Sequence, residues 1–257
     1  MAGTLEGKVA IVTGSTRGIG KALAVAMGSD GARVVVCGRS SGPDTGEGVG
    51  SIEATVADVE SVGGEAIGVR CDISREEDAA GVVAQALERW GRIDVLVNNA
   101  ASLWRQGILN TDPDKWRELL HTNLDGVYYS INAVLPSMIR QGGGAIMSLT
   151  SGRSRAVDGK TTAYTVAKTG VETLTANLAE EVREHGIAVN AIDPGPVLTK
   201  GVMDNIEEER YAQFYAIDDE RVKIVPACLY LASRSADPTR FLTGQVLKAS
   251  EYPAWVP

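Results

Sequence analysis

Tyr164 and Lys168 are the residues of this sequence best suited to proton transfer. They lie four positions apart in the stretch TTAYTVAKTGVETL, which has the pattern of a helix. Side chains at positions i and i+4 lie on one helical face, about 5–6 Å apart at Cβ. A free tyrosine titrates near pH ~10, and a nearby ammonium stabilises the phenolate and lowers that pKa. The pair is therefore a candidate acid/base unit, although this spacing also occurs by chance on exposed helices.

A glycine-rich turn near the N-terminus has the properties of a phosphate site. Gly14, Gly18 and Gly20 follow the apolar run Val9–Thr13 and open a helical segment, with the spacing G-x-x-x-G-x-G. Glycine lets the backbone approach a pyrophosphate closely, and a helix N-terminus supplies N–H groups and positive potential. The commoner dinucleotide fingerprint is G-x-G-x-x-G. The turn predicts a dinucleotide site, and a turn without a ligand is the alternative.

The residue placed to choose the cofactor is an arginine. Arg39 follows the second strand-like run. An acid near this position accepts hydrogen bonds from the adenosine ribose of NAD and repels the 2′-phosphate of NADP. An arginine instead binds phosphate bidentately. Ser40 adds a hydroxyl and Arg17 a second cation, so the sequence favours NADP(H) and leaves NAD(H) possible.

Short β-branched runs alternate with longer helical segments along the chain. We expect strands at Val9–Thr13, Arg33–Cys37, Ala66–Cys71, Val95–Asn98, Ala145–Leu149, Ile187–Ile192 and Gln245–Leu247. We expect helices at Gly18–Ser29, Ser51–Val62, Glu76–Trp90, Pro113–Arg140, Thr161–Glu184 and Lys223–Ala232. This alternation predicts an α/β fold, with a parallel sheet of about seven strands covered by helices on both faces. Right-handed crossovers make such a sheet doubly wound, with ligands at the carboxyl ends of its strands.

The bulk composition limits the class of protein. The chain has 257 residues, 44% of them hydrophobic, and a net charge of −8, which disfavours nonspecific binding to nucleic acid or anionic membranes. It contains no run of about 18 apolar residues and no signal-peptide pattern. Cys37, Cys71 and Cys228 form no C-x-x-C pair, and His121 and His185 have no metal-ligand setting. We therefore expect a cytoplasmic protein with buried free thiols and no metal site.

Taken in order, these motifs resemble those of the short-chain dehydrogenase/reductase family, in its single-domain Rossmann branch of about this length. Each motif is weak alone, but the ordered set is specific and extends over nearly the whole chain. The matches are Thr13-Gly14-x-x-x-Gly18-Ile19-Gly20, Asp72, Asn98-Asn99-Ala100, Asn123, Ser151, Tyr164-x-x-x-Lys168, Asn190-x-x-x-Pro194-Gly195 and Thr243-Gly244-Gln245. The resemblance implies one domain over residues 1–257.

The resemblance also implies a catalytic set. Tyr164 is implied to protonate a carbonyl oxygen during hydride delivery, or to act as the base in the reverse reaction. Lys168 is implied to lower the pKa of Tyr164 and to bind the nicotinamide ribose. Ser151 is implied to donate a hydrogen bond to the substrate oxygen, and Asn123 to hold a water that links Lys168 to solvent.

A larger set is implied for the cofactor, which carries the hydride while the protein orients it. Asp72 and Ile73 are implied to contact the adenine, and Asn99 and Ala100 the adenosine ribose. The full expected set is Gly14, Thr16, Arg17, Gly18, Ile19, Gly20, Arg39, Ser40, Asp72, Ile73, Asn99, Ala100, Tyr164, Lys168, Pro194, Gly195, Val197 and Thr199.

We therefore expect an NADP(H)-dependent oxidoreductase that transfers a hydride between nicotinamide and a carbonyl or secondary alcohol. One alternative is an NAD-dependent alcohol dehydrogenase of the same family. Another is a regulatory or scaffold protein that binds NADP(H) without turnover. The sequence does not choose among a 3-oxoacyl thioester, a steroid or polyol-like alcohol and a xenobiotic ketone.

Several further expectations concern the substrate end and the assembly. Residues 196–222 are implied to form a lid over the substrate. Arg153, Arg155 and Lys160 lie between Ser151 and Tyr164 and are candidates to meet a carboxylate or phosphate. Family resemblance implies a homo-oligomer, a tetramer or dimer, built on the two longest helices and the C-terminal strand.

The sequence also departs from the family pattern. Ala101 stands where the family usually has a glycine, and the C-terminus reads KASEYPAWVP in place of the usual Gly-Gly. The loop 40–51 is long and glycine-rich, and its acids Asp44 and Glu47 could fold back toward the ribose. Its role is left open between a cover for the adenine end and an insertion without one.

Overall fold

A seven-stranded parallel sheet forms the centre of the structure. The computed structural model describes residues 3–42, 50–219, 222–233 and 242–256. The strands lie in the order β3-β2-β1-β4-β5-β6-β7, and every neighbouring pair is parallel. They are β1 Val9–Thr13, β2 Arg33–Gly38, β3 Glu65–Arg70, β4 Val95–Asn98, β5 Gly144–Leu149, β6 Ile187–Asp193 and β7 Val246–Lys248. The expected doubly wound α/β fold is confirmed.

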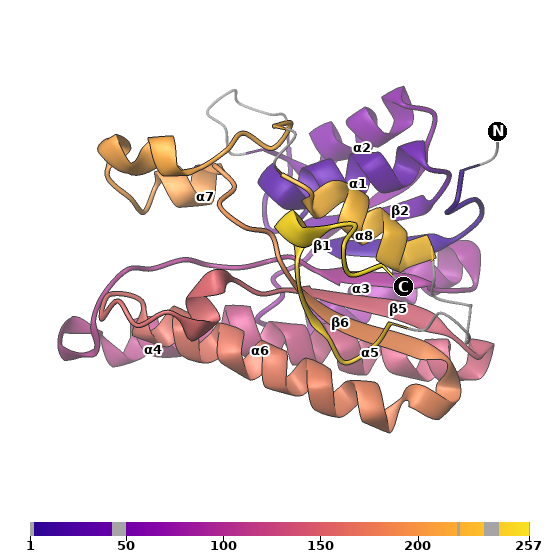
Figure 1. The fold of residues 1–257 in the computed structure, drawn as a ribbon. Helices are drawn as coiled ribbons and strands as arrows, with labels where there is room; N and C mark the ends of the chain where they lie inside the picture. Colours follow the sequence, from indigo (N-terminus) through magenta and orange to yellow (C-terminus); the bar gives the residue numbers. More distant parts are fainter. Residues whose placement is uncertain (1–2, 43–49, 220–221, 234–241, 257) are drawn as a thin grey trace.

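Helices cover both faces of the sheet (Figure 1). They are α1 Gly18–Ser29, α2 Ile52–Ser61, α3 Glu76–Trp90, α4 Pro113–Leu120, α5 Gly126–Gln141, α6 Thr162–Glu181, α7 Lys200–Met203 and α8 Ile224–Ser233. The helices α1, α2 and α8 pack on one face, and α3, α5 and α6 on the other. Alternate residues of β2 serve the two cores: Val34 and Val36 face the first group, and Val35 and Cys37 the second. Strands buried on both faces explain the continuous apolar runs of the sequence.

One expected helix is divided. The segment Pro113–Arg140 forms α4, then a π-helical turn at His121–Asp125, then α5. A π turn carries one extra residue and shifts the register of the helix that follows it. The expected helix Thr161–Glu184 ends earlier, with a 3₁₀ turn at Arg183–His185 after α6. Local periodicity does not reveal these changes, because the residues involved are compatible with a regular helix.

The chain reverses its direction of winding beside β1. From β1 it passes outward to β2 and β3, and then returns to β4 on the other side of β1. The carboxyl ends of β1 and β4 therefore diverge into loops on opposite faces, which is where doubly wound sheets bind ligands.

The three cysteines, Cys37, Cys71 and Cys228, are buried and free, and burial raises the pKa of the Cys228 thiol to about 12.

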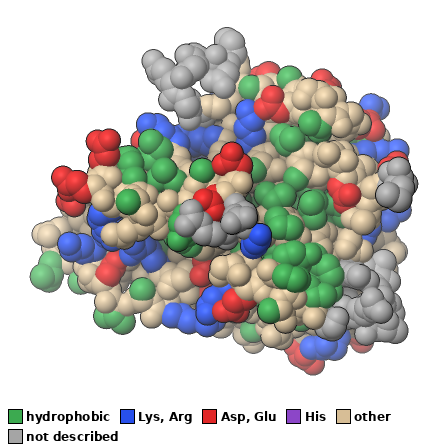
Figure 2. Space-filling model, turned by 45° about the horizontal axis from the view of Figure 1, so that its top comes forward, with side chains coloured by type: hydrophobic (Ala, Val, Ile, Leu, Met, Phe, Trp, Pro, Cys, Tyr) green, Lys and Arg blue, Asp and Glu red, His purple; other side chains and the backbone are tan. Residues whose placement is uncertain are grey.

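The surface has mixed character. On the face drawn in Figure 2, acidic, basic and apolar side chains are interspersed. None of the helices in the described segments combines the length and apolarity needed to cross a bilayer.

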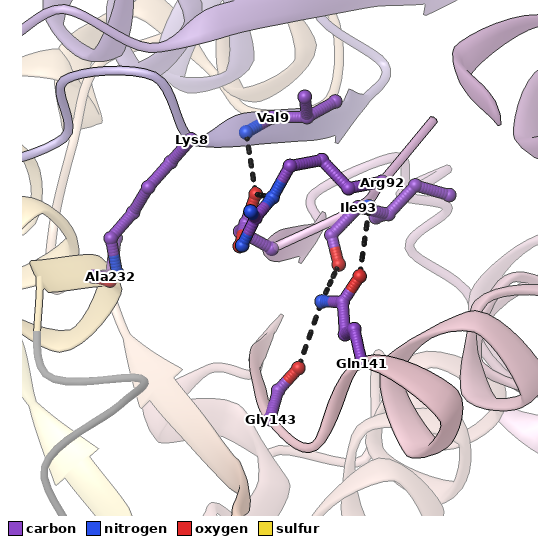
Figure 3. Close-up of polar contacts among 8 residues, drawn as sticks. Lys8, Val9, Arg92, Ile93, Gln141, Gly143 and Ala232 are labelled. Carbon is purple, nitrogen blue, oxygen red and sulfur yellow. Dashed lines mark hydrogen bonds and ion pairs between the residues drawn. The ribbon is translucent and has the colours of Figure 1, made fainter. Parts of the chain in front are cut away.

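A polar network closes the amino-terminal edge of the sheet (Figure 3). The Asp94 carboxylate accepts a hydrogen bond from Val9 N at 2.9 Å and two from the Arg92 guanidinium at 2.8 and 2.6 Å. The Gln141 amide donates to the carbonyls of Ile93 and Gly143 at 2.5 and 2.9 Å. These contacts tie β1, β4 and α5 together at the end of the sheet opposite the ligand-binding edge.

Candidate active site

A cavity of about 670 Å³ lies at the carboxyl ends of the strands. This volume is in the range of sites for small ligands and cofactors. Of the twenty residues expected to bind cofactor or catalyse, eighteen line it: Gly14, Thr16, Arg17, Gly18, Ile19, Arg39, Ser40, Asp72, Ile73, Asn99, Ala100, Ser151, Tyr164, Lys168, Pro194, Gly195, Val197 and Thr199. Gly20 and Asn123 lie behind its wall.

The glycine turn is held in shape by the neighbouring strand. Gly14 has φ +63° and Gly18 φ +56°, the left-handed region that favours glycine. A Cβ at Gly20 would lie 2.4 Å from Asn99 Nδ2. That amide donates to the carbonyls of Thr13 and Gly14 at 2.9 and 3.0 Å. The Asn99 amide therefore holds the glycine turn in place, and Asn99 also lines the cavity.

The end of the cavity beside the glycine turn carries two guanidiniums. Arg17 and Arg39 are exposed, and neither side chain forms a hydrogen bond or ion pair with a described residue. Asp72 lines the same end. Burial would raise the pKa of Asp72, but hydrogen bonds from Ser74 and the charge of Arg39 hold it below its ordinary value. This end is therefore suited to an anionic group near Arg39 and a polar one near Asp72.

The two ends of the loop after Arg39 meet at this site. The Ile52 amide donates to the Ser40 carbonyl at 3.1 Å. Gly50 has φ +64°, and a Cβ there would lie 2.0 Å from the Thr16 carbonyl oxygen. The loop thus departs from and returns to the edge of the cavity. Asp44 and Glu47 lie outside the described residues.

Ser151, Tyr164 and Lys168 come together at the other end. Ser151 directly follows β5 and Thr150, and Tyr164 and Lys168 lie in the first half of α6. Lys168 Nζ donates to the Leu149 carbonyl at 2.7 Å and lies 5.7 Å from the centroid of the Tyr164 ring. Burial lowers the pKa of Lys168 to about 8.

The electrostatics of Tyr164 differ from the expected pattern. Burial raises the pKa of Tyr164, the nearby Ser151 hydroxyl and the Arg153 guanidinium oppose this shift, and the Asp193 carboxylate adds to it. Lys168 lies over the ring and donates to a backbone carbonyl, and the net shift of the Tyr164 pKa is upward. The phenol is therefore protonated at neutral pH.

Asn123 is buried in the π-helical turn and holds a loop. Its Oδ1 accepts from Ser102 N at 2.7 Å, and its Nδ2 donates to Ser102 O at 2.7 Å. Both ends of its amide thus bind the loop that follows β4, which forms a wall of the cavity. The side chain therefore positions this loop. The water-holding role implied by the resemblance stays a prediction.

The segment after β6 contributes residues to the cavity wall. Gly195 has φ +77°, and its amide donates to Asp193 Oδ1 at 3.0 Å. Thr199 caps α7 through its hydroxyl, which accepts from Val202 N at 3.3 Å. The Tyr215 carbonyl accepts from Leu198 N at 2.8 Å, closing this segment on itself. Residues 220 and 221 at its end lie outside the described part of the chain.

Some cavity residues were not expected from the sequence. Arg105, from the loop after β4, lines the cavity, as do Leu103 and Thr122. Lys200, Asn205, Ile206 and Phe214 also line it, and they belong to the segment 196–222 that was expected to lie over the substrate. Of the three cations expected near the substrate, only Arg153 reaches the cavity. Arg155 pairs with Glu172 at 3.3 Å, and Lys160 is exposed outside it. Ala101 lines the wall with its neighbours.

Comparison with known proteins identifies the family. Residues 8–210 match the family model for short chain dehydrogenases. The chain belongs to this family. The short-chain dehydrogenases include a 3-oxoacyl-[acyl-carrier-protein] reductase from Synechocystis sp., which is 32% identical over 243 residues, 94% of each chain. They also include a 7alpha-hydroxysteroid dehydrogenase from Clostridium sardiniense, 34% identical over 94% of this chain and 91% of that one.

Solved structures agree with this assignment. A short-chain type dehydrogenase/reductase from Mycobacterium marinum superposes with a TM-score of 0.84 at 27% identity, covering 97% of this chain and 96% of that one. The protein is thus a short-chain dehydrogenase enzyme acting on CH–OH or C=O groups, in a family that uses NAD(P)(H).

Proposed function

We propose that this short-chain dehydrogenase is an NADP(H)-dependent oxidoreductase that interconverts a carbonyl and a secondary alcohol. The observation that carries the proposal is one cavity with a glycine turn and two guanidiniums at one end, neither paired with a described residue, and Ser151, Tyr164 and Lys168 at the other. The left-handed glycines and the open cavity fit a dinucleotide. When bound, the nicotinamide supplies or accepts the hydride.

Each catalytic side chain has a distinct part. Tyr164 donates its hydroxyl proton to the carbonyl oxygen, and its raised pKa keeps that proton available at neutral pH. Ser151 donates a hydrogen bond to the same oxygen. Lys168 supplies positive charge beside the phenol while it is protonated, below pH about 8. Asn123 fixes the loop of Ser102 and so the wall facing these groups.

The preference for NADP(H) rests on charge at the adenine end. The 2′-phosphate distinguishes NADP from NAD, and Arg39 with Arg17 supplies two guanidiniums for it. Ser40 adds a hydroxyl at the cavity edge. The NAD-linked alternative requires a carboxylate acting on the ribose, and Asp72, whose pKa is held low, is the described acid at this end.

We also propose a homo-oligomer of cytoplasmic location. Tyr128 and Ile139 on α5 are 50% and 40% exposed, and Val166 on α6 is 44% exposed. Apolar side chains on these two helices support an assembly through them, which light scattering would measure. The three free thiols support a reducing compartment.

Substitution of Tyr164 tests the mechanism. We expect Tyr164→Phe to lower turnover by at least about 100-fold, since positioned proton transfer contributes about 10²–10⁴. The assay is a panel of ketones and alcohols followed at the nicotinamide absorbance with both cofactors. Tyr128→Phe, which removes an exposed hydroxyl from α5, is the matched control.

Two results would count against the proposal. Tyr164→Phe with wild-type turnover on an accepted ketone would remove the acid role. Tight NADPH binding with no turnover of the whole panel would favour the scaffold alternative.

A further inference from the structure

Two arginines from different loops meet at the substrate end of the cavity. Arg105 comes from the loop after β4, and Arg153 from the 3₁₀ turn Gly152–Arg155 after β5. Both line the cavity together with Ser151 and Tyr164. They converge on one carboxylate: Asp158 Oδ2 lies 2.5 Å from Arg153 Nη1 and 3.9 Å from Arg105 Nη2.

A single carboxylate does not satisfy this pair. The other oxygen of Asp158 accepts from Lys160 N at 2.8 Å and from Thr161 Oγ1 at 2.9 Å. Asp158 is thus anchored at the start of α6 and shared by two guanidiniums, which leaves one positive charge in excess. The Arg105 side chain is only 14% exposed, yet among the described residues it has no hydrogen-bond partner. A guanidinium has five donors, and burying it with so few partners costs free energy.

Counting Arg105 itself, three guanidiniums lie near two carboxylates here. Burial lowers the pKa of Arg105, and the Arg153 and Arg210 guanidiniums lower it further, against Asp158 and Glu207. Another pair of charges on the cavity wall is balanced, because Lys200 Nζ lies 2.8 Å from Asp204 Oδ1. Acidic and basic side chains lie close together on the left of Figure 2, the side where α7 lies in Figure 1.

We infer that the substrate carries an anionic group, a carboxylate or a phosphate, which binds between Arg105 and Arg153 while its reacting carbon faces Ser151 and Tyr164. The inference rests on the proposed function, because it assigns the substrate class of the same site. An anion there satisfies the donors of Arg105, neutralises the excess charge and orients the substrate, as paired guanidiniums do for planar oxyanions. If the arginines only fixed the two loops to each other, substrate charge would have no effect.

The test compares three ketones of equal chain length: a keto acid, its methyl ester and a keto phosphate. We expect wild-type kcat/KM to favour an anionic ketone over the ester by at least about tenfold, the scale of hydrogen bonds to charged groups. The keto acid and keto phosphate identify which anion is preferred. The preference should decrease with added salt.

Variants of Arg105 locate the effect. Arg105→Gln should reduce the anion-to-ester ratio to near one, and Arg105→Lys should retain part of it. Arg155→Gln is the matched control, because Arg155 lies on the same 3₁₀ turn as Arg153, pairs with Glu172 and is outside the cavity. An unchanged ratio in Arg105→Gln, or a wild-type ratio of one, overturns the inference.

A binding measurement separates this inference from the proposed function. Titration calorimetry of the non-reacting saturated acid and its methyl ester reads charge preference without turnover. Tighter binding of the acid than of the ester, lost in Arg105→Gln, would support the anion site. If no ketone were reduced at the same time, that failure would weigh against the proposed function and not against the anion site. Equal affinity of acid and ester overturns the anion site, whatever the turnover.

Discussion

Arg39 and Arg17 are the side chains that we propose to select the cofactor. Both are exposed at the cavity edge with no described carboxylate paired to them, so neither must break an ion pair to meet a phosphate. Arg39 lies close enough to Asp72 to lower the pKa of that carboxyl, which places a cation and an anion at one end of the cavity.

Replacing Arg39 should therefore change the cofactor preference. We expect Arg39→Asp to weaken NADPH binding by about tenfold to hundredfold, since it removes a charged hydrogen bond and adds a repelling charge. NADH binding should change little. Dissociation constants from fluorescence titration of both cofactors measure the difference, with the exposed Arg140→Asp as control. Equal losses for the two cofactors would disprove the selecting role of Arg39.

Lys168 should set the alkaline limit of ketone reduction. Burial lowers its pKa to about 8, so the ammonium is present below that pH and is lost above it. The pKa of Tyr164 is raised, so the phenol still holds its proton in this range. We expect kcat/KM for reduction to be level at neutral pH and to fall above pH about 8, because kcat/KM reports the ionisation of the free enzyme.

The variant Lys168→Arg tests whether Lys168 causes the fall of kcat/KM above pH about 8. A guanidinium stays charged throughout the accessible range, so any remaining activity should lose its fall near pH 8. The profile is measured with one ketone from pH 6 to 10 at constant ionic strength. If kcat/KM of Lys168→Arg still falls at the same pH, the fall belongs to the ionisation of another group.

At the scale of elements, the glycine turn and the end of β4 work as one unit. Gly20 lies in the first turn of α1 and packs on the Asn99 amide, which in turn bonds the carbonyls of Thr13 and Gly14. Helix propensity alone would favour alanine at Gly20 by about 1 kcal/mol. The close contact is the stronger effect, because the Cβ would lie 2.4 Å from both Asn99 Nδ2 and the Gly14 carbonyl oxygen.

Two glycine-to-alanine variants separate these effects. We expect Gly20→Ala to displace the turn, to destabilise the protein by about 1–3 kcal/mol and to weaken NADPH binding. Gly81→Ala in α3, where no atom lies within 4 Å of the added Cβ, should stabilise by about 0.5–1 kcal/mol and leave binding unchanged. Urea unfolding and cofactor titration measure both. Unchanged stability and binding in Gly20→Ala would mean that the turn adapts at no cost.

The elements that could be predicted are those encoded locally. Apolar runs and helical periodicity predicted each of the seven strands to within about two residues, and with them the doubly wound sheet. The π turn at His121–Asp125 could not be predicted in this way. It is stabilised by Asn123 bonding both backbone groups of Ser102, a contact between segments 21 residues apart. Local pattern carries no signal for such a pairing.

The same reason explains the predicted and missed parts of the site. Residues at strand ends converge because parallel strands end at one edge, so motif residues such as Ser151 and Asn99 fell in the cavity. Arg105 belongs to no motif, and it reaches the site because its loop packs beside the one that carries Asp158. Among the cations after Ser151, spacing could not tell that Arg153 points inward and Arg155 pairs with Glu172.

At the scale of the whole molecule, the two edges of the sheet have different tasks. The carboxyl edge holds the cavity, with its left-handed glycines and two guanidiniums that no described carboxylate pairs. The amino edge holds the Asp94 network, whose polar groups are paired with each other (Figure 3). The paired groups at the amino edge thus contribute to stability, and the cavity lies at the opposite edge.

This division predicts that Asp94 contributes to stability and not to catalysis. Its side chain is only 8% exposed and accepts the amide of Val9 at the start of the central strand. Asp94→Ala leaves that buried donor unpaired, so we expect a loss of about 1–3 kcal/mol in unfolding free energy. Asp94→Asn keeps an acceptor and should lose less unfolding free energy.

Asp58→Ala is the control: it breaks the partly exposed ion pair with Lys21, in which the two charged atoms lie 2.6 Å apart, and should cost about 0–1 kcal/mol. Urea midpoints, with KM for cofactor measured in parallel, test the series. A change in KM with Asp94→Ala, or a loss no larger than with Asp58→Ala, would contradict the separation of the two edges.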